Sequence, residues 1–350
     1  MFVVKVNREL LLQQLESVQP GLSTREIVEQ SSCFCFRGGM VFTFNEEIAC
    51  SHECNLPLEG AIQAAPFLAI LRKLPDEELE VVEAEGEIQL FGKRRTLGIR
   101  RESDFLLPID SVELPKKWKP LPAEFLEAIG IVQTCVGKDE SFFSMTCVHV
   151  HPDYLEACDN TQLCRYALTT NVREEFLVRG SSVKHITSLG MIEFSETKSW
   201  LHFRSSSGLI LSCRRYIEEF PDLSKLLKCR GIKTTLPKGL VEAAEKASVF
   251  SAENVDANQV TIELRPGKLR IRGQGISGWY TETKKIQYDG EPILFLVSPQ
   301  LLSEITQRYN ECEISQERLK VEGKGFTYVT CLGAPAAEKE TEPAEEAVVE

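Results

Sequence analysis

One arrangement of residues occurs three times along the chain, and it constrains the fold more than any single motif does. Each copy opens with an amphipathic helix, predicted for residues 7–18, 122–133 and 237–248. Strand-like runs follow this helix. The second half of each copy has a short helix and three more strand-like runs, in residues 62–101, 176–215 and 294–333. The chain is therefore expected to be α+β, with three units of helix–strands–helix–strands, each about 115 residues long.

The hydrophobic periodicity supports this interpretation. The second helices carry apolar residues at helical spacing: Phe67, Ile70, Leu71 and Leu74; Val183, Ile186 and Leu189; Leu301, Leu302 and Ile305. The following strands alternate in polarity, as at Ile88 and Leu90, Leu201 and Phe203, and Leu319 and Val321. Pro122 and Pro237 fall near the first turns of their helices, where a missing N–H is tolerated.

Domain boundaries are expected in the segments 114–122 and 228–237, which are rich in Pro and Lys and are interpreted as linkers. The predicted domains are residues 1–116, 117–234 and 235–335, followed by a tail at 336–350. The tail has six Glu, one Lys and no aromatic residue. Such a composition cannot bury enough apolar surface to fold, so the tail is expected to be disordered and acidic.

The net charge of −12 argues against wholesale coating by nucleic acid, but it leaves room for a local basic surface. No apolar run approaches the roughly 20 residues that a membrane helix needs, so no membrane partner is expected. Lys5 and Arg8 interrupt the apolar N-terminal stretch, which therefore does not fit a signal peptide. A cytoplasmic location is expected.

The 12 cysteines are interpreted mainly as small buried residues, because disulfides are rare in the cytosol. No pair has CxxC spacing. The nearest approaches to a metal site are Cys50, His52 and Cys54, and His149 with His151 on one strand face. An enzyme would have its best site at Cys158, Asp159 and Cys164, with a histidine from elsewhere. No base is visible nearby, so no catalytic residue, cofactor or metal is expected.

Several motifs within the triple repeat resemble the bacterial DNA polymerase III beta subunit, the beta sliding clamp, from residue 1 to about 334. The motif NRELLLQQL followed by LSTRE is similar to the first helix and loop of that family, and LAILRKLPDEELEV to its second helix and turn. LEACDNTQLCRYAL resembles its domain 2 loop, which usually contains T-D-G-H-R-L. LSCRRYIEEFPDLSKLL and YVTCL resemble its F-P-D segment and closing strand.

The resemblance implies a head-to-tail homodimeric ring that encircles duplex DNA without sequence readout and performs no chemistry. Its partners would be the replicative polymerase, the clamp loader and other clamp-motif proteins, bound as short peptides in a cleft between domains 2 and 3. A second interpretation stays open: a clamp-like regulator or decoy that does not load on DNA.

The resemblance also implies site residues. The DNA-facing candidates are Arg8, Arg25, Arg72, Lys73, Lys138, Phe142, Phe143, Arg179 and Lys184, with Lys238 placed from helix position alone. The alternative for each basic residue is a solvated surface charge. At the protomer interface the candidates are Leu97 and Ile99, which could equally belong to the core of the first domain.

For the partner-peptide cleft the resemblance implies Cys158, Asn160, Thr161, Gln162, Leu163, Lys246, Ala247, Phe295, Val329, Thr330, Cys331 and Leu332. Core packing, or a plain turn at 160–162, is the alternative. Asn160 stands where the family has Gly, and Asn tolerates the left-handed backbone, so the turn is expected to persist. Family chains usually end after the closing strand. The acidic tail is therefore expected either to gate the cleft or only to improve solubility.

Overall fold

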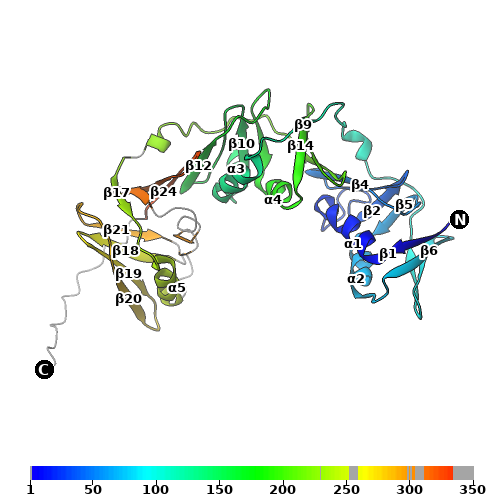
Figure 1. Ribbon diagram of the computed structural model, residues 1–350, viewed down its shortest axis with the longest axis horizontal. Helices are drawn as coiled ribbons and strands as arrows, with labels where there is room; N and C mark the ends of the chain where they lie inside the picture. The colour runs from blue at the N-terminus through cyan, green and yellow to red at the C-terminus, as the bar shows by residue number, and fades with distance from the viewer. Residues whose placement is uncertain are drawn as a thin grey trace. The chain divides into compact units, whose positions relative to one another are not determined.

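The structure, a computed structural model, describes residues 2–228, 230–251, 259–297, 299, 302–303 and 311–333. These residues form two compact units (Figure 1). The first unit contains the chain up to Ala157 together with Tyr166–Phe220. The second contains Cys158–Arg165 and the described residues from Pro221 onward.

The same order of elements occurs three times, which confirms the predicted α+β repeat. The first copy has β1 (Val3–Asn7), α1 (Arg8–Ser17), β2 (Cys33–Arg37), β3 (Met40–Phe44), β4 (Ile48–Glu53), β5 (Gly60–Gln63), α2 (Ala64–Lys73), β6 (Glu78–Ala84), β7 (Glu87–Phe91) and β8 (Thr96–Arg100). The second has β9 (Lys119–Pro120), α3 (Phe125–Val132), β10 (Cys147–His151), β11 (Tyr154–Cys158), β12 (Gln162–Ala167), β13 (Phe176–Arg179), α4 (Gly180–Ser188), β14 (Met191–Glu196), β15 (Trp200–Ser205) and β16 (Ile210–Arg214).

The third copy lies in the second unit. It has β17 (Ile232–Thr235), α5 (Leu240–Ser251), β18 (Val260–Arg265), β19 (Lys268–Gln274), β20 (Trp279–Lys285), β21 (Ile293–Val297), β22 (Glu311–Ile314), β23 (Arg318–Glu322) and β24 (Phe326–Cys331). A short 3-10 helix, η5 (Leu226–Lys228), precedes β17. For the second helix predicted in this copy, Leu301 and Ile305 lie outside the described residues, whereas Leu302 is buried.

Each repeat also contains short strands that the sequence did not predict, and one of them precedes each of the helices α1 to α5. β1 pairs with β6, β9 with β14 and β17 with β22, so the strand before the first helix joins the sheet of the second half. The other three short strands join the sheet of the first half of their repeat: β5 pairs with β2, β13 with β10 and β21 with β18. The interpretation of 114–122 and 228–237 as simple linkers was therefore wrong, because each carries an edge strand, β9 or β17.

Local chemistry explains the helices and their packing. The Asn7 side chain caps α1 by accepting the Leu10 N–H at 2.9 Å. α2 buries Ala64, Phe67, Leu68 and Leu71, which is one face at helical spacing. α1 packs on α2 and α3 packs on α4 (Figure 1). In each of the first two repeats, the two helices therefore lie side by side.

The core of the first unit joins the first two repeats. β4 pairs with β16 and so makes one eight-stranded sheet, in the order β5-β2-β3-β4-β16-β15-β14-β9. The ring of Trp200 on β15 packs against Phe44 on β3, with centroids 6.0 Å apart. Both side chains are buried, and each such burial stabilises the fold by about 2–3 kcal/mol. The two repeats therefore share a continuous apolar core.

Candidate functional site

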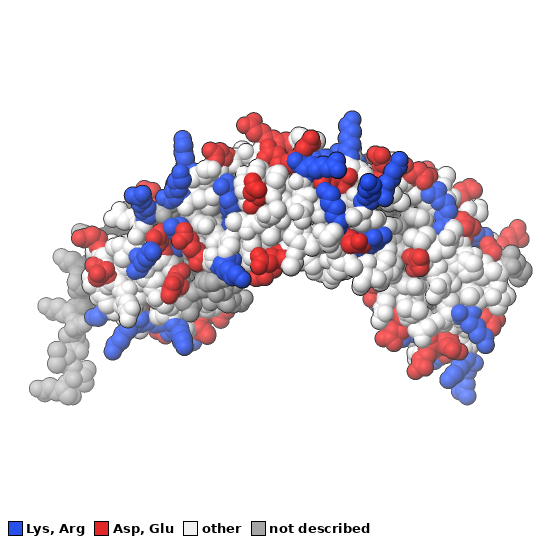
Figure 2. Space-filling view, turned by 45° about the horizontal axis from the view of Figure 1, so that its top comes forward, with Lys and Arg blue, Asp and Glu red and all other residues white. Residues whose placement is uncertain are grey.

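The described helices carry no net charge from Lys, Arg and Glu. Their basic residues are Arg8, Arg72, Lys73, Lys184 and Lys246. Their acidic residues are Glu9, Glu16, Glu127, Glu242 and Glu245. Figure 2 shows a similar mixture over one face, where Lys and Arg side chains are interspersed with Asp and Glu. A surface of this kind attracts a phosphate backbone only weakly.

Two of the predicted DNA-facing residues lie exposed at the end of α2. The Arg72 Nη2 is 2.8 Å from the Glu16 carboxylate of α1, and both side chains are substantially exposed. Lys73, the next residue, is exposed, and so is Lys184 on α4. Lys73 and Lys184 can therefore reach a phosphate directly, whereas Arg72 must first give up or share its contact with Glu16.

Arg8 is committed to a structural contact. Its Nε donates to the Asp76 carbonyl at 3.1 Å and its Nη1 donates to the Leu71 carbonyl at 3.2 Å. Leu71 lies in the last turn of α2, whose carbonyl groups have no partner within the helix. The Arg8 guanidinium therefore holds the end of α2 against the start of α1, and this role was not visible in the sequence.

The predicted loop residues differ in their exposure. Arg25 and Lys138 are exposed, and Phe142 is 52% exposed. Phe143 instead packs edge-to-face on Tyr216, with centroids 4.8 Å apart, and lies under the Arg179 guanidinium. Arg179 also donates to Glu140 and to the Thr146 hydroxyl, each at 2.7 Å. Phe143 and Arg179 thus stabilise the loop, which leaves Lys138 and Phe142 as the accessible pair.

The turn at 159–162 is closed by the carboxylate of Asp159. Its Oδ1 accepts the backbone N–H groups of Thr161 at 2.7 Å and Gln162 at 2.8 Å. The predicted turn therefore exists, but its suggested cause was wrong, since Asn160 is not among the described residues with positive φ. The carboxylate of Asp159 is occupied by these N–H groups, which argues against a catalytic role beside Cys158 and Cys164.

The same hydrogen bond closes the equivalent turn in all three repeats. The N–H of Asn45 donates to the Ile48 carbonyl at 3.0 Å, that of Asp159 to Gln162 at 2.9 Å and that of Gly275 to Gly278 at 2.9 Å. Asn45 also accepts the N–H of Ile48 at 2.8 Å through its side chain, as Asp159 does in its own turn. The backbone conformations differ, because Glu46 has a positive φ of 71° whereas Asn160, at the same position, does not.

The turn at 159–162 docks on β24. The Cys331 N–H donates to the Thr161 carbonyl at 2.7 Å, and the Tyr328 hydroxyl donates to the Gln162 side chain at 2.8 Å. Asn160 and Thr161 are exposed here, and so is Cys331. The structure therefore brings this part of the predicted cleft together, with a neutral, hydrogen-bonding rim.

The remaining cleft residues fall into two groups. The apolar ones are buried: Cys158, Leu163, Phe295, Val329 and Leu332, together with the Thr330 side chain. The N–H of Leu296, next to Phe295, donates to the Gly333 carbonyl at 3.0 Å, which places Phe295 near Leu332. Ala247 and Lys246 lie on α5, which packs on β19 and β20.

The candidate interface residues Leu97 and Ile99 lie on β8, at the end of the sheet β1-β6-β7-β8. They stand opposite Leu90 and Ile88, which are buried. Leu97 and Ile99 are themselves only half-buried. They extend the apolar face of the first repeat to the open edge of its sheet. They therefore pack partly on the core of the first repeat and remain partly exposed, as an interface residue would.

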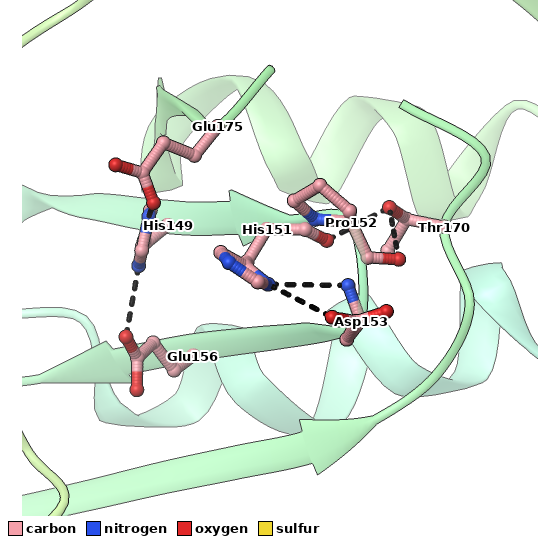
Figure 3. Close-up of polar contacts among 7 residues, drawn as sticks. All are labelled: His149, His151, Pro152, Asp153, Glu156, Thr170 and Glu175. Carbon is pink, nitrogen blue, oxygen red and sulfur yellow. Dashed lines mark hydrogen bonds and ion pairs between the residues drawn. The ribbon is translucent and has the colours of Figure 1, made fainter. Parts of the chain in front are cut away.

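His149 and His151 share one face of β10, as predicted, but carboxylates surround them (Figure 3). The Nδ1 of His149 is 2.8 Å from Glu156 and its Nε2 is 3.3 Å from Glu175. The Nδ1 of His151 accepts the Asp153 N–H at 3.2 Å. Nowhere in the part of the chain that the structure describes do three or more His, Cys, Asp or Glu residues form a group able to hold a metal ion.

The cysteines behave as packing residues, as the sequence predicted. Of the described cysteines, only Cys331 is exposed. Burial raises the pKa of the Cys50 thiol to about 12 and that of Cys54 to about 11. A thiol in such an apolar setting is a poor nucleophile and a poor metal ligand. His52, between them, faces the Ser17 hydroxyl and the Ser207 carbonyl instead.

Comparison with known structures defines the class of fold. The DNA polymerase III beta chain of Streptococcus pneumoniae is 16% identical with a TM-score of 0.78, over 95% of this chain and 100% of that one. The DNA polymerase sliding clamp of Pseudomonas aeruginosa is 14% identical, with a TM-score of 0.77 over 95% and 100%. The beta subunit of Thermotoga maritima is 16% identical, with a TM-score of 0.77 over 95% and 100%.

The chain therefore has the fold of the DNA polymerase III beta sliding clamps, at very low sequence identity. No protein-family model and no curated protein matches the sequence. Among the described helices, none is long and apolar enough to cross a membrane.

Sequence reasoning missed two sets of surface residues. The first is apolar and exposed, near β20: Val249 at 67%, Ile276 at 93% and Trp279 at 67%. The motif GISGW did contain the signal, because apolar residues rarely occupy a glycine-rich turn tip. The second set is basic: Lys225, Lys228, Arg230 and Lys233, of which the last three lie in the segment interpreted as a linker, next to Lys238, which was a DNA-facing candidate.

Proposed function

We propose that this protein is a DNA sliding clamp, a ring that encircles duplex DNA without reading its sequence and performs no chemistry. One observation carries the proposal. Successive repeats are joined by pairing of the third strands of their half-repeats, and two such strands, β8 and β20, remain at the ends of sheets. Its partners would be the replicative polymerase, the clamp loader and other proteins with clamp-binding motifs. Such a clamp acts on chromosomal DNA in the cytoplasm.

This pairing involves the third strand of each half-repeat. β4 of the first repeat pairs with β16 of the second, where Cys50 stands opposite Leu211. The start of β12 lies beside β24 in the same way, through the hydrogen bond from Cys331 to Thr161. Among the described strands, β8 and β20 are the third strands that remain at a sheet end. A second copy placed head to tail would pair each β8 with a β20, and two copies would close the ring.

The surface beside β20 suits such a contact. α5 packs on β19 and β20, and a Cβ at Gly278 would lie 3.0 Å from the Phe250 ring. The hairpin tip and the end of α5 therefore touch, and exposed apolar residues lie on both: Val249 on α5, and Ile276 and Trp279 at the hairpin. Clustered exposed apolar side chains are typical of a protein interface. On the other edge, Leu97 and Ile99 would complete their burial.

The solution mass tests ring closure. We expect the protein to run at twice its chain mass of 39.4 kDa, and Val249→Asp to convert it to a monomer with an unchanged circular dichroism spectrum. Leu294→Asp is the matched control, because Leu294 is 50% exposed on β21, at the opposite end of the same sheet. A wild-type chain that stays monomeric at micromolar concentration would exclude the closed ring.

A topological assay tests the function itself. The protein is loaded by a clamp loader on nicked circular DNA, which is then cut at one site. A sliding ring leaves the cut DNA within minutes, whereas it stays on the uncut circle. Because the helices carry balanced charge, retention on the circle should change little between about 50 and 200 mM salt, unlike direct phosphate binding. Retention after cutting would contradict the proposal.

For the partner cleft, the turn at 159–162, whose one ionisable side chain is the carboxylic acid Asp159, favours peptides that offer hydrogen-bonding and apolar groups over acidic ones. Gln162→Ala removes the bond to Tyr328 and should weaken a bound clamp-motif peptide about three- to tenfold, the effect of one hydrogen bond. Thr327→Ala, on β24 but outside the turn contacts, is the control. An equal loss of peptide affinity in both variants would mean that the turn at 159–162 is not part of the peptide-binding cleft.

A second function is favoured by a specific feature of β20, and it stays open as an alternative. Glu282 lies on the α5 side of this strand, bonded to Tyr280 at 2.6 Å and Lys284 at 2.7 Å. Inward-pointing charges are a device that prevents edge pairing. A clamp-like regulator that stays open would be monomeric and would fail the loading assay, so the same two measurements separate the functions.

A further inference from the structure

The segment 223–241 is a basic stretch in an acidic chain. It contains Lys225, Lys228, Arg230, Lys233 and Lys238, and no Asp or Glu, in a protein of net charge −12. These five residues are called the basic strip here. A run of like charges destabilises the surface that carries it, unless counterions or an opposite charge are nearby.

The structure leaves every residue of the basic strip exposed. None of the five forms an ion pair or hydrogen bond through its side chain with any described residue. Some other cations of the same unit are paired, such as Lys320 with Glu313 at 2.6 Å and Lys284 with Glu282 at 2.7 Å. Lys225 interacts electrostatically with the neighbouring Asp222, but no residue of the strip forms a side-chain ion pair with a described residue.

The strip lies close to the strand that leads into the acidic tail. It begins at η5, which contacts β24 within the second unit. It continues along β17, the end strand of the sheet that contains β24, β23 and β22. β24 ends at Cys331, and residues 334–350 follow it. The chain after β24 thus starts beside one end of the strip.

The acidic tail has the matching charge. Residues 336–350 contain six Glu and one Lys. The 17 residues after Gly333 could span at most about 55–60 Å when extended, which is ample to follow the strip. Covalent attachment gives such a tail an effective concentration in the millimolar range, so weak exposed ion pairs are enough for partial occupancy.

We propose that the acidic tail docks on the basic strip of its own chain and shields it from polyanions. Free lysines and arginines in a row bind nucleic-acid phosphates without sequence specificity. The tail's carboxylates compete with phosphates for these cations. The protein would therefore avoid binding DNA on a surface other than the helices, and removal of the tail would expose that surface.

The test uses three variants of the full protein. The first ends after Pro335. The second keeps the tail length but replaces its six Glu by Gln, which separates charge from length. The third replaces Lys225, Lys228 and Arg230 by Gln. Each binds a fluorescent linear duplex of about 20 base pairs, too short to hold a ring topologically, at about 50 mM salt.

The first two variants should bind the duplex about tenfold more tightly than the unmodified protein, and the gain should vanish above about 300 mM salt. The same gain should disappear when either tail change is combined with the third variant. Zero-length carbodiimide cross-linking gives a direct readout: Glu residues of the tail should couple to Lys225, Lys228, Lys233 or Lys238 within one chain.

Three results would overturn the proposal. The first is unchanged duplex affinity after tail removal. The second is cross-links that form only between chains. In the third, the strip variant binds the duplex more weakly while tail removal has no effect, which would make the strip a permanently open nucleic-acid surface. None of these results bears on ring closure, since the duplex cannot be encircled stably.

Discussion

β4 and β8 occupy equivalent positions, as the third strands of the two halves of the first repeat, yet their surfaces differ. All residues of β4 except Glu53 are buried, because β16 of the next repeat covers its edge. On β8 the residues alternate between exposed and half-buried. A joint within one chain can be almost fully buried because its partner strand is always present. An edge that would join a second copy in the proposed ring must also remain stable in water.

β20 shows the same compromise in another form. Its α5-facing side carries Tyr280, Glu282 and Lys284 instead of aliphatic residues. Hydrogen bonds from Lys284 and Tyr280 lower the pKa of the Glu282 carboxyl, and Lys246 adds to this effect. The charges satisfy one another on the free edge, so β20 avoids pairing with unrelated strands. The joint between β4 and β16 is thus extensively buried, whereas the open edge of β20 carries charges that limit unspecific pairing.

The largest expected effect comes from weakening the joint between β4 and β16 within the chain. Leu211 is fully buried on β16 opposite Cys50, and Leu211→Ala should lower the free energy of unfolding by about 3–4 kcal/mol. Leu97→Ala at the half-buried β8 edge is the matched substitution, with a loss of about 1 kcal/mol. Urea denaturation at low protein concentration measures both. Equal losses would show that the two edges are packed alike.

Acid should weaken the same joint through His202. This side chain is buried on β15, with its Nδ1 2.8 Å from the Ser212 hydroxyl of β16. Burial lowers the pKa of His202 from 6.5 to about 4. Below pH 6.5 the unfolded chain therefore binds a proton that the folded chain does not, so stability falls between pH 6.5 and about 4, by up to about 3 kcal/mol.

Denaturation at several pH values checks this, with His202→Gln as the comparison. In the variant, the free energy of unfolding should depend much less on pH between pH 6.5 and 4, whatever its absolute stability. Carboxylates contribute a slope of their own in both proteins, so the difference between the two curves is the quantity of interest. Parallel curves would mean that His202 accepts its proton without disturbing the joint.

The repeat was predictable because hydrophobic periodicity is local. Helices such as α2 and alternating strands such as β7 can be recognised from the hydrophobic pattern of about ten residues or fewer. The short strands β9 and β17 did not, because β9 has only two residues, one of them Pro120, and its partner Phe194 lies far along the chain. Pairing across such a separation leaves no local pattern.

The candidate site was less predictable, for the same reason. The turn at 159–162 depends on Asp159, a neighbour in sequence, and its presence was predicted correctly. The role of Arg8 depends on the carbonyls of Leu71 and Asp76, more than sixty residues away. The charges of the basic strip were visible in the sequence, but only the structure shows that they are exposed and unpaired.

At the β20 edge we expect a smaller effect, and one that strengthens an interaction instead of weakening it. The pair Glu282→Val and Lys284→Val leaves net charge unchanged and removes the inward charges. We expect the dimer dissociation constant to fall about tenfold, or about 1.4 kcal/mol, since an apolar edge pairs more readily. Thr281→Val with Thr283→Val, on the other face of the same strand, is the control. Equal tightening in both would assign the effect to β propensity alone.

The smallest effect concerns the exposed pair between Arg72 and Glu16. Glu16→Gln should change the free energy of unfolding by less than about 0.5 kcal/mol, because exposed ion pairs contribute little. It does, however, free a cation on a helical surface of balanced charge, so affinity for a short linear duplex should rise about two- to threefold at low salt. Glu9→Gln makes the same charge change on α1 without releasing Arg72. If both variants gain equally, net charge controls the contact with DNA; a gain in Glu16→Gln alone identifies Arg72 as the side chain that reaches the phosphate.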